Sequence, residues 1–198
     1  MSEATKKKIL SGARVCLARE GHRRSTIKRI SEYAGVNHGL LHHYFGSKEE
    51  LMVALLEQQT NHMLKELFQD QPHWLEKLRK GERPLELQQM EHEELLKQSF
   101  ETLEKRFFSL HDDFSRVIIE FLSMSEEMPR VAAKLREVFR ERRHLLGLYF
   151  DSDNPGLPTL LLGAMMGLLF HYRLDPEIAV EQARDLLRDQ LFHNSIKP

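Results

Sequence analysis

Apolar residues recur at helical spacing along almost the whole of this 198-residue chain, and no stretch alternates in the manner of a β-strand. In residues 6–19, for example, Ile9, Ala13, Cys16 and Leu17 share one face of a helix. Glycines, prolines and capping residues separate the periodic segments from one another. The sequence therefore predicts an all-α fold of about nine helices.

Capping residues divide the first fifty residues into short helices. Gly21 is expected to end the first helix, Thr26 is a good N-cap for the second, and Gly35 supplies its C-terminal cap. The third helix is expected to begin at the N-cap Asn37 and to end before Gly46. Three short helices therefore form a small N-terminal domain, predicted as residues 1–46.

A long helix is predicted to join this domain to a larger helical bundle, residues 47–198. Ser47 and Glu50 form a capping box at its start, and the helical pattern continues over 48–69. Further helices are expected over 85–108, after 111–113, over 129–150, over 158–174 and over 176–192. The polar stretch 151–158 is the clearest loop.

Charge is distributed unevenly along the chain. The first 48 residues carry ten basic and three acidic side chains, whereas the rest has a net charge of −8. A basic head favours a polyanionic partner, although a solvated basic face would give the same count. One cysteine, no signal-peptide pattern and no apolar run near the ~20 residues of a membrane span favour a cytoplasmic protein that has no membrane segment.

The short connection between the second and third helices is typical of a helix-turn-helix, in which the second helix enters the major groove of DNA. At about 100° per residue, Leu41 and Phe45 share one face of the third helix and can pack with Val36 onto the other helices. The other face presents Gly39, Leu40, His43 and Tyr44. A short helix that exposes such residues requires a partner.

Three histidines in this helix also raise the alternative of a metal site. His38 and His42 are four residues apart, but no cysteine is near and the nearest acids, Glu49 and Glu50, belong to the next helix. Two ligands without a third make a weak zinc site. The chain also lacks a glycine-rich phosphate loop and a nucleophile–base motif. We therefore expect no metal, no cofactor and no enzyme activity.

The run from residue 9 to residue 56, ILSGARVCLAREGHRRSTIKRISEYAGVNHGLLHHYFGSKEELMVALL, resembles the N-terminal domain of TetR/AcrR-type transcriptional regulators. The matching residues are in register without a gap: Ile9, Ala13, Gly21, Thr26, Ile30, Ala34, Gly35, Val36, Gly39, Leu41, Tyr44, Phe45, Lys48, Glu50 and Leu51. The resemblance implies a repressor that binds double-stranded DNA at a palindromic operator as a homodimer. The rest of the chain resembles the family only in pattern.

The resemblance also implies roles for ten residues. Four correspond to the family's phosphate contacts, namely Thr26, Lys28, Tyr44 and Lys48, and hydroxyl and ammonium groups suit phosphate oxygens. Four correspond to its base-reading positions, namely His38, Gly39, Leu40 and His43. Asn37 and His42 complete the predicted DNA-binding set. Leu40 and His42 differ from the residues common in the family, which leaves the operator sequence open.

In such regulators the last two helices of each subunit form the dimer interface, here about 158–174 and 176–192. Small residues four positions apart, which let two helices approach closely, occur at Gly163 and Gly167 with Ala164 beside them. On the final helix the apolar stripe consists of Val180, Ala183, Leu187 and Leu191. An ordinary core helix would show the same pattern.

The resemblance further implies a cavity for a small hydrophobic effector whose binding releases the DNA. The candidate lining residues are Met63, Leu67, Trp74, Phe100, Phe121, Met124, Phe139, Phe150 and Met166. Such side chains at helical spacing also form ordinary cores. Glu120, His144 and His171 lie in apolar-rich helices, but none by itself indicates a ligand counter-charge. The alternative is a regulator whose body binds a protein partner.

Overall fold

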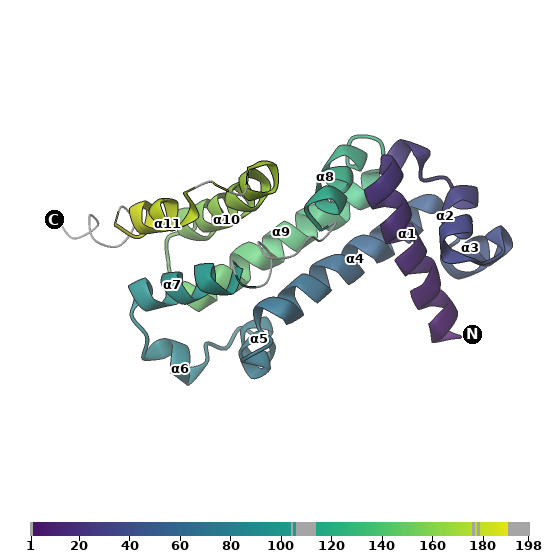
Figure 1. The fold of residues 1–198 in the computed structure, drawn as a ribbon. Coiled ribbons are helices and arrows are strands. Elements are labelled where there is room, and N and C mark those ends of the chain that lie inside the picture. The colour runs from purple at the N-terminus through teal and green to yellow at the C-terminus, as the bar shows by residue number, and fades with distance from the viewer. Residues whose placement is uncertain (1, 104, 106–113, 176, 178, 190–198) are drawn as a thin grey trace. The chain divides into compact units, whose positions relative to one another are not determined.

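The computed structural model describes residues 2–103, 105, 114–175, 177 and 179–189. Its secondary structure in these residues is helical throughout, which confirms the predicted all-α fold (Figure 1). The helices are α1 (Glu3–Arg24), α2 (Ile27–Ala34), α3 (His38–Phe45), α4 (Lys48–Leu67), α5 (Pro72–Arg79), α6 (Leu85–Gln88), α7 (His92–Leu103), α8 (Phe114–Met124), α9 (Pro129–Phe150), α10 (Gly156–Leu174) and α11 (Val180–Arg188).

The part of the chain described by the structure has eleven helices where the sequence suggested about nine, and the difference lies in residues 70–103. The predicted helix over 85–108 is wrong, because α6 ends at Gln88 and α7 begins only at His92. Arg83 donates from Nη2 to the Leu87 carbonyl oxygen at 2.8 Å. In a continuous helix this oxygen would accept a hydrogen bond from a backbone N–H of the next turn. The helix α5 was not predicted, although proline stands at its first position.

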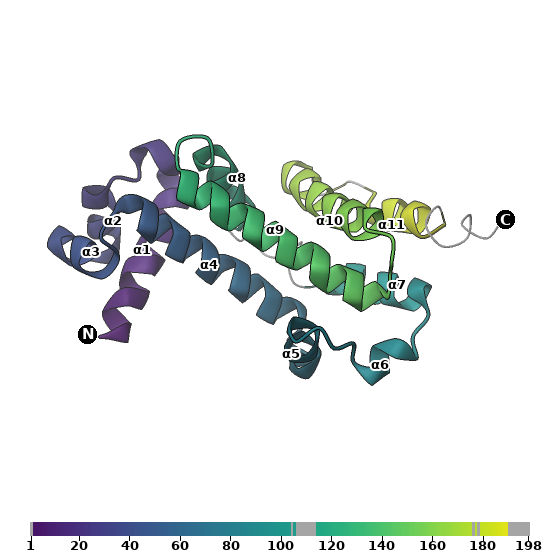
Figure 2. The ribbon, with the colours of Figure 1, turned by 180° about the vertical axis from the view of Figure 1, so that it is seen from behind.

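The structure divides into two compact units. Unit 1 consists of residues 1–63 and 113–139, and unit 2 consists of residues 64–112 and 140–198. In unit 1, α1 packs on α2 and on α8, and its core includes Leu17, Ile30 and Leu41. The first half of α9 lies beside the first half of α4 in both views (Figures 1 and 2), where Lys134 pairs with Glu57 at 3.4 Å.

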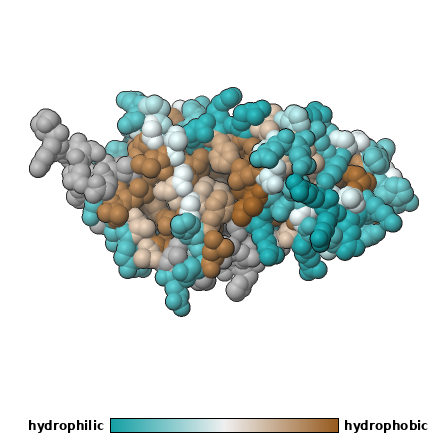
Figure 3. All heavy atoms as spheres, turned by 90° about the horizontal axis from the view of Figure 1, so that it is seen from above, coloured by the Kyte–Doolittle hydropathy of each residue, from teal (hydrophilic) through white to brown (hydrophobic). Residues whose placement is uncertain are grey.

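Unit 2 has its own core, in which aromatic rings are prominent. Trp74 of α5, Phe100 of α7 and Tyr149 of α9 are buried together, and the Trp74 and Tyr149 ring centroids lie 6.4 Å apart. The helix α11 contacts α7. Apolar side chains also gather on the outer face over α10 and α11 (Figure 3). Within the described residues, no helix is long and apolar enough to cross a membrane.

Candidate nucleic-acid interface

The caps predicted for α2 and α3 are confirmed. The Thr26 hydroxyl accepts a hydrogen bond from the backbone N–H of Arg29 at 3.2 Å, and Asn37 Oδ1 accepts one from the N–H of Gly39 at 2.9 Å. Between the two helices Gly35 has a φ of 59°, a left-handed conformation that glycine adopts at little cost. Local sequence therefore sets the short turn that orients α3.

The predicted helical phase of α3 is confirmed as well. Leu41 and Phe45 are buried, with 1% and 9% of their surface exposed. The N-terminal and outer positions of the helix are exposed, namely His38, Gly39, Leu40, His42 and His43. The face that the sequence assigned to base reading is therefore open to solvent in the described chain.

Tyr44 is half-buried and lies between this face and the start of α1. Its hydroxyl donates to the Ser2 carbonyl oxygen at 3.4 Å, and its ring meets the His43 ring edge-on at 5.5 Å between centroids. The contact brings the first turns of α1, with the exposed Lys6 and Lys7, beside α3. These lysines contribute to the basic charge of the first 48 residues, but their sequence positions alone do not place them at the candidate interface.

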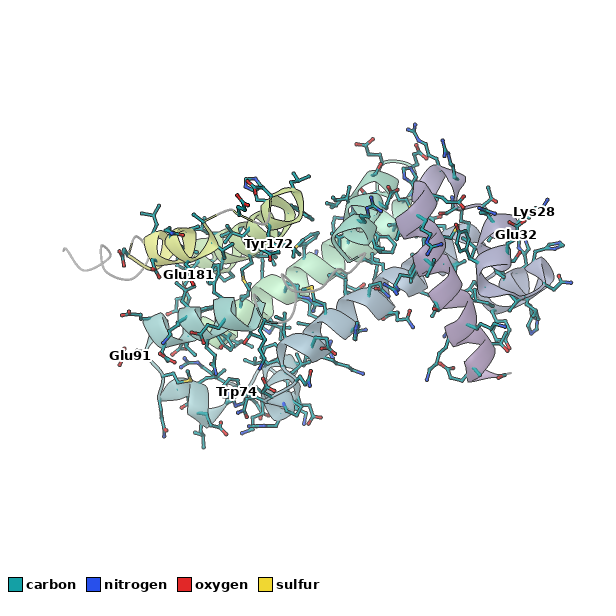
Figure 4. The ribbon with its side chains drawn as sticks, viewed as in Figure 1. Lys28, Glu32, Trp74, Glu91, Tyr172 and Glu181 are labelled. Carbon is teal, nitrogen blue, oxygen red and sulfur yellow. The ribbon has the colours of Figure 1, made fainter. Side chains whose placement is uncertain are left out.

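The basic residues of α2 have different surroundings. Lys28 is exposed and projects outward from the helix (Figure 4). Arg29 donates from Nε to Glu20 at 2.7 Å and from NH1 to Glu32 at 2.8 Å, and these hydrogen bonds raise the pKa of its guanidinium. Arg29 therefore ties α2 to α1, whereas Lys28 is available to an external anion.

Lys48, another predicted phosphate contact, is half-buried. Its ammonium group donates to the His22 carbonyl oxygen at 2.7 Å, and burial lowers its pKa. His22 belongs to the last turn of α1, where carbonyl groups lack partners within the helix. In this structure Lys48 therefore satisfies the end of α1, and a phosphate contact by this residue stays a prediction.

Gly12 allows the close approach of α1 to α2 that holds the helix-turn-helix together. A β-carbon at this position would lie 2.5 Å from the Ala34 backbone nitrogen and 2.6 Å from the Ala34 Cα. Such distances are shorter than any non-bonded contact allows, so that only glycine fits. The role of Gly12 was not predicted, because a glycine inside a helical pattern does not by itself reveal a close neighbour.

The histidines of α3 have surroundings that suit hydrogen bonding. The Nδ1 atom of His42 lies 3.2 Å from the Gly46 carbonyl oxygen, at the end of the helix. Among the described residues there is no group of three or more His, Cys, Asp or Glu side chains that could hold a metal ion. The His42 ring therefore lies against the C-cap residue of α3, Gly46, while His38 and His43 lie on the exposed face of the helix.

The residues predicted for the dimer interface lie on α10 and α11. Gly163 is exposed and Gly167 is half-buried, and β-carbons added to either would meet nothing within 4 Å. Val180 is buried, whereas the other described members, Ala164, Ala183 and Leu187, are half-buried. Leu191 lies outside the described residues.

The residues predicted to line an effector cavity are divided between the two units. Trp74, Phe100 and Phe150 belong to the buried core of unit 2, and Leu67 packs against it. Phe121 and Met124 are fully buried in unit 1. The remaining three, Met63, Phe139 and Met166, are half-buried. Their role in binding an effector stays a prediction.

Residues 9–55 match the family model described as bacterial regulatory proteins, tetR family. Over 59 residues the chain is 37% identical to the HTH-type transcriptional repressor AcnR of Corynebacterium efficiens, which aligns 30% of this chain with 31% of that protein. Over 70 residues it is 33% identical to the HTH-type transcriptional regulator BetI of Brucella anthropi, covering 35% of this chain and 34% of that one. The match thus spans about a third of the length of these relatives.

Solved structures resemble the chain over nearly its full length. A transcriptional regulator from Rhodococcus sp. Rha1 superposes with a TM-score of 0.71 and 17% identity, covering 98% of this chain and 99% of that one. A regulator from Saccharomonospora viridis, solved in complex with choline, gives a TM-score of 0.65 and 16% identity, with 98% of each chain covered. At these identities the likeness concerns the fold.

Proposed function

We propose that this chain, which belongs to the tetR family of bacterial regulatory proteins, is a transcriptional regulator that binds double-stranded DNA through α3. The observation that carries the proposal is the exposed face of α3, which presents His38, Leu40 and His43 from a helix anchored by two buried residues. Imidazoles can donate to or accept from base edges, and Leu40 can contact a thymine methyl group. We call residues 3–45, which comprise α1 to α3, the DNA-reading head.

Phosphate contacts would surround the reading helix. Lys28 is exposed on α2, Thr26 stands at the N-terminus of that helix, and Tyr44 lies at the edge of α3. Ammonium groups, hydroxyls and helix N-termini bind phosphate oxygens, and such contacts fix the register of a protein on the duplex. We assign residues 1–46 to DNA binding and residues 47–198 to dimerisation and effector binding.

A second copy of the chain is the partner that suits α10. The open surface at Gly163 and Gly167 would let a helix from another subunit approach closely. Large apolar side chains nearby are exposed, at 50% for Leu160, 85% for Leu174 and 62% for Leu186. Because a two-fold dimer presents two reading helices in opposite directions, its operator would be palindromic.

Repression is the regulatory outcome we propose, because the curated relatives that share the N-terminal domain include proteins named repressors. The regulator would act in the cytoplasm, and a small hydrophobic effector would release it from DNA. A metabolite that raises the unfolding temperature and also releases operator DNA would identify that effector. If no metabolite raises the unfolding temperature, the alternative is favoured, in which residues 47–198 bind a protein partner.

Two substitutions on α3 should separate base reading from phosphate binding. Tyr44→Ala should weaken binding to all operator sequences to a similar degree, because a phosphate contact carries no sequence information. His43→Ala should instead alter the base preference at one position in each half-site, where the free-energy difference between the preferred base and the others should change by about 1–3 kcal/mol. Affinities for a set of single-base operator variants, measured by fluorescence anisotropy, test both. Equal effects of His43→Ala on every variant would contradict its role in base reading.

A further inference from the structure

A buried contact joins the end of α1 to α8, 98 residues away in the sequence. The His22 backbone N–H donates to Glu120 Oε2 at 2.6 Å, and His22 Nδ1 lies 2.8 Å from the same oxygen. Because a carboxylate oxygen only accepts, the proton of the ring lies on Nδ1 in this geometry. One oxygen of Glu120 therefore takes two hydrogen bonds from one residue of the DNA-reading head.

His22 is largely shielded from solvent and Glu120 is partly shielded. The side chain of His22 is 9% exposed and that of Glu120 is 27% exposed. The Nε2 atom of His22 is buried and has no hydrogen-bond partner in the described chain, so within that part of the protein the hydrogen bond that orients the ring is the one to Glu120. Hydrogen bonds to a charged acceptor are stronger than neutral ones, and burial strengthens them further.

The backbone beside His22 is shaped for this contact. Gly21 has a φ of 75° and interrupts the helical conformation of α1, which continues through Arg24. A β-carbon at Gly21 would lie 3.3 Å from Glu120 Oε1, so a side chain there would press on the carboxylate. Gly21, expected from the sequence to end the helix, thus makes the kink that brings His22 to α8.

The same residue also contacts the start of α4. The His22 carbonyl oxygen accepts the hydrogen bond from Lys48, which stands at the first position of that helix. His22 is therefore held from two sides, by Glu120 of α8 through its N–H groups and by Lys48 of α4 through its carbonyl group.

We propose that Glu120 is a positioning residue that, through His22, fixes the DNA-reading head on α8 and thereby sets the spacing of half-sites that the dimer accepts. The inference rests on the proposed dimeric DNA binding. A dimer tolerates one spacing because its two heads are held rigidly, and an inserted base pair both separates and rotates the half-sites. Without the Glu120–His22 contact the DNA-reading head can change its orientation to fit other half-site spacings, and affinity for the operator with the preferred spacing falls.

A neighbouring pair supplies a matched control. Arg23 follows His22 and pairs with Glu127, which follows α8, at 3.6 Å between NH2 and Oε1. These side chains are 81% and 55% exposed, and exposed pairs contribute little. Glu127→Ala therefore removes a carboxylate from the same neighbourhood and leaves both partners of the His22–Glu120 contact in place.

The experiment uses the full-length protein and an operator obtained by in vitro selection from random DNA. Affinities are measured for that operator and for versions with one base pair inserted or deleted between the half-sites, and thermal unfolding is recorded for each protein. We call the factor by which an inserted or deleted base pair weakens binding the spacing penalty. For Glu120→Ala we expect about tenfold weaker binding to the selected operator and a spacing penalty about tenfold smaller than that of the wild type. Glu127→Ala should match the wild type in both.

Substitutions of His22 test the contact from its other side. His22→Leu removes the ring donor and should relax the spacing preference, whereas His22→Asn can place an amide N–H about where Nδ1 lies and should keep it. Glu120→Gln retains an uncharged acceptor, so its spacing penalty should lie between those of the wild type and Glu120→Ala. It replaces Glu120→Ala in the experiment if the alanine variant does not fold.

An unchanged spacing penalty in folded Glu120→Ala or Glu120→Gln would overturn the inference, as would equal behaviour of the leucine and asparagine variants. A wild-type protein that selects no inverted repeat would overturn the proposed function, and the inference with it. A penalty that is relaxed in Glu120→Ala and His22→Leu but kept in Glu127→Ala and His22→Asn would support both the inference and the proposed function.

Discussion

Gly12→Ala is expected to destabilise the DNA-reading head, although the same change usually stabilises a helix. Alanine is favoured over glycine inside a helix by about 1 kcal/mol. Here the added β-carbon would lie 2.5–2.6 Å from three atoms of Ala34, two of them backbone atoms, so α1 and α2 must move apart. We expect a net loss of about 3 kcal/mol from overpacking, which lowers the unfolding temperature by about 10 °C.

Thermal unfolding followed by circular dichroism measures this effect, and Ser11→Ala is its control. Ser11 is the exposed neighbour of Gly12 on α1, so alanine there should be neutral or slightly stabilising. A Gly12→Ala variant as stable as the wild type would mean that α1 and α2 are not packed as closely as the structure has them.

Gly163→Phe is expected to abolish tight operator binding without unfolding the subunit. A β-carbon at Gly163 meets nothing within 4 Å, so the subunit itself has room for a side chain. A phenyl ring would occupy the surface where we propose that a second copy packs, and the dimer would dissociate. A monomer that holds a single half-site loses the gain from linked binding, so operator affinity should fall by about 100-fold or more.

Light scattering coupled to gel filtration and operator titrations measure the two parts of this prediction. Ala133→Phe places the same side chain at an exposed position of α9 and serves as the control. A Gly163→Phe protein that is still dimeric and still binds its operator would contradict the assignment of α10 to the dimer interface.

The features that were predicted from sequence are local ones. The caps Thr26, Gly35 and Asn37 act within a few residues of themselves, and each was confirmed. The burial of Leu41 and Phe45 follows from helical phase, which needs only the identity of one short segment. The architecture of the helix-turn-helix could therefore be predicted from the stretch between Thr26 and Phe45.

The features that were not predicted depend on contacts between distant segments. Glu120 was noted as a titratable residue in an apolar helix, but nothing local shows that its partner is His22. Lys48 matched a phosphate-contact position, yet its ammonium group contacts the end of α1 because the fold brings the two together. The break between α6 and α7 was missed because Arg83, which donates to the Leu87 carbonyl oxygen, lies outside both helices.

For the residues predicted to line an effector cavity, the sequence does not separate a binding role from a role in the core. Aromatic and methionine side chains at helical spacing fit a core and a cavity equally well, and Trp74, Phe100 and Phe150 lie in the core of unit 2. Periodicity shows which face of a helix is buried, but it does not show whether protein or ligand covers that face.

The central claim is sequence-specific binding of DNA through α3, and a titration of purified protein against its selected inverted repeat tests it most directly. Anisotropy measurements with that DNA and with a shuffled duplex of the same composition should be made between 50 and 200 mM salt. We expect affinity for the inverted repeat about a thousandfold or more above that for the shuffled duplex, and a decrease of about a thousandfold over this salt range as counterions are released. Equal affinity for the two duplexes at every salt concentration would contradict the account.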